Sequence, residues 1–127
     1  MSMDWSAKAK KVVKSFSYAL QGIGYAARLE RNLKIHLTIT LIVVILGFLF
    51  SLSKIEWLFV LVAIAGVITL ELVNTAIERV VDLVTEDEHP LAKQAKDTAA
   101  GAVLVFAIIA VIMGVVIFGP KIWRLIF

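Results

Sequence analysis

The chain has 127 residues, 61% of them hydrophobic, a mean hydropathy of +0.94 and a formal net charge of +3. Soluble domains use roughly 45–50% apolar residues, so this composition excludes an ordinary soluble domain and predicts an integral membrane protein of one domain. The sequence contains no cysteine, which excludes disulfides, thiolate metal sites and cysteine nucleophiles.

Residues 4–29 are predicted to form an amphipathic helix on the membrane surface. With a step of about 100° per residue, apolar side chains such as Trp5, Val12 and Phe16 fall on one side, and Lys11 and other polar side chains fall on the other. Such a helix lies in the interface, with its lysines toward phosphate and water. Anchoring alone explains most of these lysines.

Glu30 breaks this pattern, because a continued helix would place its carboxylate on the apolar side. Two explanations stay open. Either the helix ends near Gly22 and Gly24, or Glu30 faces a partner other than lipid.

Three charge-poor stretches predict transmembrane helices at about residues 34–53, 55–84 and 94–119. A bilayer core about 30 Å thick requires about 20 helical residues. The middle stretch is free of charge only over Trp57–Leu70, so it spans the bilayer only if its helix continues through Glu71 and Glu78 toward Val84. Some of the carboxylates therefore belong to a membrane helix, and the predicted fold class is an all-α membrane protein.

The basic residues orient these spans. Seven of the 13 Lys and Arg residues lie in residues 1–34 and three in residues 79–96; the others are Lys54, Lys121 and Arg124. The positive-inside rule places the N-terminus and the 85–97 loop in the cytoplasm, and the short 51–56 turn and the C-terminus outside. The pI near 9.3 then reflects topology and anionic headgroups rather than nucleic acid.

Glu71, Asn74, Glu78 and Asp82 form one polar stripe on the middle span. Their spacings of three, four and four place them within an arc of roughly 80° on a helix. An ionisable group at membrane depth costs about 2.5–3.5 kcal/mol on insertion scales, so it usually faces a bundle interior or a cavity. For Asp82 and the acids at 86–88 a solvated interfacial charge is an equal explanation, whereas Glu71 and Glu78 favour a functional site.

Parallel carboxylates suit Mg²⁺, which takes one or two protein carboxylates and completes its shell with water and phosphates. A further carboxylate could deprotonate a hydroxyl nucleophile in phosphoryl transfer. Acids alone would repel phosphates, so cationic groups must complete the site, and Lys96 with Lys11 or Lys14 is the nearest supply. The P-loop and GxGxxG signatures are missing from the sequence.

The residues alone therefore predict an acidic, metal-dependent site that faces the cytoplasm. A proton-coupled carrier stays open, although the internal repeats or broken helices of such carriers are not recognisable in the sequence. A non-catalytic membrane adaptor would explain the basic surface helix but not the one-sided acidic stripe.

Three segments resemble the prokaryotic diacylglycerol kinases, which are small integral-membrane lipid kinases. They are GIGYAARLERNLKIH, ELVNTAIERVVDL and HPLAKQAKDTAAGAVLV, at residues 22–36, 71–83 and 89–105. The details NTAIE, HPLAK, AKDTAAGAV and FGPK resemble the Gram-positive branch, whose members are similar to undecaprenol kinases. The resemblance implies one lipid kinase domain over residues 1–127, in a bacterial cell membrane, assembled as a homotrimer with sites between subunits.

The resemblance also implies a reaction and its residues. ATP with Mg²⁺ would phosphorylate a lipid alcohol, either undecaprenol or, as the alternative, diacylglycerol. Glu71 matches the catalytic base, Asn74 the polar residue that orients this base or the lipid hydroxyl, and Glu30 and Glu78 the ligands of the metal of Mg-ATP. The nucleotide contacts match Lys11, Tyr18, Asp87, Glu88, His89, Lys96 and Asp97. Lys11 stands where the enterobacterial form carries arginine, so the charge is kept and the bidentate fork is lost. Asp82 receives no role.

Overall fold

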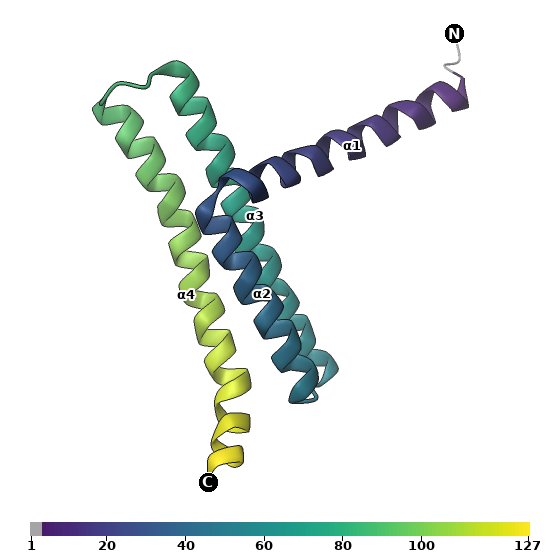
Figure 1. The fold of residues 1–127 in the computed structure, drawn as a ribbon, viewed down its shortest axis with the longest axis vertical. Helices are drawn as coiled ribbons and strands as arrows, with labels where there is room; N and C mark the ends of the chain where they lie inside the picture. The colour runs from purple at the N-terminus through teal and green to yellow at the C-terminus, as the bar shows by residue number, and fades with distance from the viewer. Residues whose placement is uncertain (1–3) are drawn as a thin grey trace.

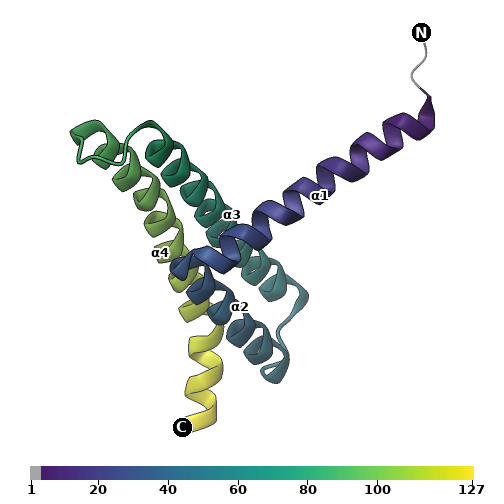
Figure 2. The same ribbon diagram turned by 45° about the horizontal axis from the view of Figure 1, so that its top comes forward.

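The protein folds into four α-helices, as seen in a computed structural model that describes residues 4–127. They are α1 (Trp5–Leu29), α2 (Arg31–Leu49), α3 (Lys54–Val84) and α4 (Pro90–Ile126). The described residues contain no strand, so the all-helical prediction is confirmed. Figures 1 and 2 show α2, α3 and α4 grouped in one bundle, with α1 projecting away from it.

Helices α2, α3 and α4 are each long and apolar enough to cross a membrane, which fits a multi-pass membrane protein. α3 continues without a break through Glu71 and Glu78 to Val84. α4 has 37 residues and includes Pro120, so it is longer than the 94–119 span expected from hydropathy, because a helix need not end where the bilayer does. α3 and α4 run past the junction of α1 and α2 before they reach their connecting loop (Figure 1).

The bundle has two distinct ends. We call residues 50–53, between α2 and α3, the turn end, and residues 85–89, between α3 and α4, the loop end. The C-terminus lies toward the turn end (Figure 1).

The turn end closes α2 with a Schellman motif. The N–H of Leu52 donates to the carbonyl of Gly47 at 3.1 Å, and the N–H of Ser51 donates to that of Phe48 at 3.2 Å, the bonding pattern that defines this motif. Ser51 has a φ of 51°, a left-handed conformation that such caps usually give to glycine.

The start of α3 is also determined locally. Ser53 caps it, and the side chain of Glu56 returns a hydrogen bond to the Ser53 backbone, which completes a capping box. Glu56 also pairs with Lys121 of α4 at 3.1 Å. Local bonds therefore cap α2 and α3 at this end, and the Glu56–Lys121 pair joins α3 to α4.

The most buried apolar cluster lies next to the turn end. Leu52, Val60, Ile117 and Phe118 form its centre. Farther along the bundle, α3 approaches α4 closely at Gly66, where a Cβ atom would collide with the ring of Phe106. Close approach through a small residue is common in membrane helix pairs, because it lets the backbones pack tightly.

Glu30 alone separates α1 from α2. α1 passes through Gly22 and Gly24 and ends at Leu29, and Glu30 adopts an extended backbone with φ −96° and ψ 114°. The first explanation for Glu30, an earlier helix end, is therefore wrong. The described part of α1 buries only Ala26.

Candidate functional site

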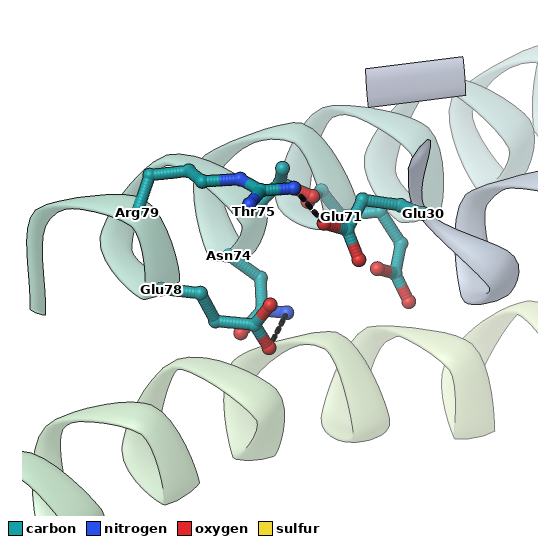
Figure 3. Close-up of polar contacts among 6 residues, drawn as sticks. All are labelled: Glu30, Glu71, Asn74, Thr75, Glu78 and Arg79. Atoms are coloured by element: carbon teal, nitrogen blue, oxygen red, sulfur yellow. Dashed lines mark hydrogen bonds and ion pairs between the residues drawn. The ribbon is translucent and has the colours of Figure 1, made fainter. Parts of the chain in front are cut away.

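The polar stripe of α3 reaches the bundle interior at two residues. Glu71 is 4% exposed and Asn74 is 7% exposed, and both lie on one face of α3 because a spacing of three residues returns to the same side of a helix. Glu78, one turn farther on, is half-buried. Figure 3 shows Asn74 and Glu78 directed from α3 toward α4.

The two acids nearest the bundle interior, Glu71 and Glu78, each have a separate partner. Oε1 of Glu71 lies 3.2 Å from Nε2 of His36 on α2, and Nδ2 of Asn74 donates a hydrogen bond to Oε1 of Glu78 at 3.2 Å. The hydroxyl of Thr75 donates to the backbone carbonyl of Glu71, not to its carboxylate. The negative charges of Glu78 and Glu30 both act on Glu71, so the acids occupy one electrostatic site.

The two outer acids pair with cations of other segments. Arg79 reaches back along α3 and donates to Oε1 of Glu30 at 3.0 Å (Figure 3). The second explanation for Glu30 thus applies, because its carboxylate faces a guanidinium. Asp82 pairs with Lys96 of α4, so this residue, which the sequence left without a role, joins α3 to α4.

Sequence reasoning missed His36 and Arg79 as members of this cluster. A lone histidine near a membrane boundary usually reads as an interfacial residue, and Arg79 entered the sequence analysis only as a charge that orients the spans. The signal that could have found His36 was its depth along the bundle. Because α2 and α3 run in opposite directions, an ionisable residue early in α2 lies near residues late in α3, and such residues usually find a partner inside the bundle.

The oxygen atoms of this cluster fit a magnesium ion. Among residues 4–127, no three acidic or histidine side chains gather closely enough to hold a metal by themselves, but Mg²⁺ needs only one or two protein carboxylates besides water and phosphate oxygens. Oδ1 of Asn74 is buried and accepts no hydrogen bond from the part of the chain that the structure describes. An unpaired buried oxygen is rare in folded proteins, and it indicates a place for a donor or a cation beside Glu78.

Most of the predicted nucleotide contacts gather at the loop end. A pocket of about 650 Å³ is lined by Asp87, Glu88, His89, Lys96 and Asp97, together with neighbouring residues. Their side chains are partly engaged within the chain. Nδ1 of His89 accepts a hydrogen bond from the N–H of Leu91 and caps α4, and Asp97 pairs with Lys93.

The other two predicted contacts lie elsewhere. Tyr18 lines a separate pocket of about 570 Å³ between α1 and α3, beside Thr75 and Arg79. Lys11 is exposed, in the half of α1 that projects away from the bundle (Figures 1 and 2). One chain therefore brings Glu30, Glu71, Asn74 and Glu78 together but leaves Lys11 apart from them.

Comparison with known proteins shows which family the chain resembles. The family model described as prokaryotic diacylglycerol kinase matches residues 17–118. The chain is 51% identical to the undecaprenol kinase of Bacillus subtilis over 94% of its own length and 98% of that protein. It is 45% identical to a diacylglycerol kinase of Synechocystis over 84% of its length and 61% of that protein. It is 30% identical to the diacylglycerol kinase of Haemophilus influenzae over 84% of its length and 92% of that protein. The family match runs from the second half of α1 through the acidic stripe and most of α4, and together with the 51% identity it shows that the chain belongs to the prokaryotic diacylglycerol kinase family.

Proposed function

We propose that this chain is an ATP- and Mg²⁺-dependent lipid kinase that phosphorylates the hydroxyl group of undecaprenol at the cytoplasmic membrane face. The observation that carries the proposal is the buried carboxylate of Glu71 on a membrane helix, beside Glu78 and the unpaired oxygen of Asn74. Acids at such depth are costly and mark function. The 51% identity to a protein named undecaprenol kinase supports this lipid as the substrate.

Glu71 acts as the catalytic base. Its Oε1 contacts His36, and its Oε2 accepts the proton of the lipid hydroxyl, which must approach within about 2.6–3.2 Å. The hydroxyl oxygen then bonds to the γ-phosphorus while the bond between this phosphorus and the β–γ bridging oxygen breaks, and ADP leaves. Asn74, one turn after Glu71, orients the base or the hydroxyl.

Glu30 and Glu78 would hold the Mg²⁺ of Mg-ATP, with Oδ1 of Asn74 as a neighbouring neutral oxygen. When bound, the ion neutralises charge on the phosphates. The ion pair with Arg79 keeps the Glu30 carboxylate against α3, and the hydrogen bond from Asn74 orients that of Glu78. These two contacts orient the carboxylates that would hold the ion.

The nucleotide lies at the loop end. The pocket there supports contacts with Asp87, Glu88, His89, Lys96 and Asp97. Lys11 and Tyr18 of α1 contribute from a second side. Because Lys11 lies on the projecting half of α1, its contact is made to a site on a neighbouring subunit, in line with a homotrimer whose sites are shared between subunits.

We infer the position of α1 and the orientation of the spans from the distribution of charge along the sequence. α1 lies on the inner leaflet of a bacterial cell membrane as an amphipathic helix, and the loop end faces the cytoplasm. The turn end and the C-terminus face outward. Residues 1–127 form one lipid kinase domain, with α1 at the surface and three spans near 34–53, 55–84 and 94–119.

Phosphoryl transfer in detergent tests the proposal. The purified chain is incubated with Mg²⁺, ATP labelled in the γ-phosphate and mixed micelles that contain undecaprenol, diacylglycerol or neither lipid. We expect label in the lipid fraction with undecaprenol, at a higher rate than with diacylglycerol. A higher rate on diacylglycerol, the substrate in the names of two of the relatives, would reverse the substrate assignment. No transfer to either lipid would contradict the kinase assignment and favour a membrane carrier or adaptor instead.

A further inference from the structure

The carboxylate of Glu71 needs a partner in its surroundings. It lies inside a membrane helix, with a side chain 5% exposed, and the charges of Glu78 and Glu30 act on it. A buried carboxylate beside like charges is unfavourable unless a donor or an opposite charge compensates it. The geometry of this compensation also determines which way the base points.

The neighbouring donors on α3 are already engaged. Nδ2 of Asn74 donates to Glu78, the hydroxyl of Thr75 donates to a backbone carbonyl, and Arg79 donates to Glu30. Within residues 4–127, the one side-chain polar contact of the Glu71 carboxylate is with Nε2 of His36, at 3.2 Å. The orientation of this carboxylate thus depends on a side chain from another helix.

His36 also borders an apolar groove of about 250 Å³ between α2, α3 and α4, whose lining includes Val43, Val67 and Ile117. Its imidazole is 24% exposed, so it lies between the groove and the base. A neutral imidazole with its proton on Nε2 can donate to Oε1 of Glu71. That contact leaves Oε2 as the oxygen that can receive a proton.

We propose that His36 is a positioning residue for the base: its Nε2 holds Oε1 of Glu71 and directs Oε2 toward the hydroxyl of the lipid alcohol. This role rests on the proposed lipid kinase function. Among residues 4–127, the polar contact of His36 is with Glu71 and not with Glu30 or Glu78, so its loss acts on the chemical step. The binding of Mg-ATP, which depends on other residues, stays the same.

Steady-state kinetics of the purified full-length chain in undecaprenol micelles test this role. His36→Leu removes the donor at similar volume, and His36→Gln keeps an amide N–H near the position of Nε2. We expect His36→Leu to lower kcat roughly 10–100-fold, because small misplacements of a catalytic group cost up to about 100-fold. KM for Mg-ATP should stay unchanged, and His36→Gln should recover most of kcat. Equal loss in the Leu and Gln variants, or a loss that falls on KM for Mg-ATP, would overturn the proposal.

Two further variants separate positioning from folding. Thr38→Val removes a polar group at nearly the same depth of α2, from an exposed side chain that donates a hydrogen bond to the Lys34 carbonyl, and it should leave kcat unchanged. If His36→Leu does not fold, His36→Asn replaces it, because its shorter amide stops short of Oε1. An Asn variant as active as the Gln variant would then refute the role. An unmodified chain without kinase activity would instead refute the proposed function on which the role rests.

Discussion

The turn end and the acidic cluster on α3 are built in opposite ways. At the turn end, backbone bonds and a capping box pair the polar groups of residues that lie close together in the sequence. An apolar cluster packs beside them. Around Glu71, each acid instead depends on one partner, and for Glu71, Glu30 and Asp82 that partner lies on another helix segment. Oδ1 of Asn74 has no hydrogen-bond partner among residues 4–127. The interactions at the turn end stabilise the fold, whereas the acidic cluster contains polar groups whose hydrogen bonds are incomplete. This difference is expected where function requires groups to remain available.

The largest effect should come from the base. Glu71→Gln keeps the shape of the side chain but cannot accept the proton, so we expect kcat to fall roughly 10²–10⁴-fold, the usual range for general base catalysis. Binding of Mg-ATP and the unfolding temperature in detergent should change little, because the amide removes a repelling charge. Turnover near that of the unmodified chain would show that another group takes the proton.

A smaller effect is expected from a metal ligand. Glu78→Gln keeps an acceptor for Asn74 and removes the charge, so half-maximal activity should require at least about tenfold more Mg²⁺, since groups that merely orient metal ligands contribute roughly 10–100-fold in affinity. A Mg²⁺ titration of initial rates measures this shift. Glu56→Gln, which removes an acid near the turn end, is the matched control and should leave the Mg²⁺ requirement unchanged.

On the side of stability, Gly66→Ala should disturb the contact between α3 and α4. Its Cβ collides with the ring of Phe106, and overpacking of this kind typically costs about 1–3 kcal/mol. Among residues 4–127, a Cβ atom at Gly114 of α4 meets no atom within 4 Å beyond its chain neighbours and nearby helix backbone, so Gly114→Ala should leave stability equal or slightly higher. Unfolding in a denaturing detergent measures both variants, and equal stabilities would show that the ring moves aside freely.

The smallest effect should be a gain at the turn end. Ser51→Gly relieves a left-handed conformation that costs an L-residue roughly 1–2 kcal/mol, so stability should rise by about 1 kcal/mol. Ser51→Ala keeps the Cβ and should give no gain. Kinase activity should stay constant in both, and a change in activity would mean that the two regions are coupled rather than separate.

The elements of the fold could be predicted from the sequence because they depend on local periodicity. Hydropathy identified three apolar helices, and the spacing of Glu71, Asn74 and Glu78 placed them on one face of α3, two of them buried in the structure. These inferences need only the regular geometry of a helix.

The partners of the stripe could not be predicted in the same way. The contact of His36 with Glu71, and that of Lys96 with Asp82, depends on the relative depth of two helices, which no single-helix pattern contains. The backbone at Glu30 was also ambiguous, because two glycines upstream offered an equally good helix end. The roles assigned to the nucleotide contacts stay predictions that rest on resemblance.

The single residue between α1 and α2 has a mechanical consequence. A residue offers only two soft torsions, so any swing of α1 against the bundle must turn φ or ψ of Glu30 itself. The same residue carries the carboxylate that contacts Arg79. A change in the angle between α1 and the bundle would therefore reach the acidic cluster directly, because no linker between α1 and α2 can absorb it.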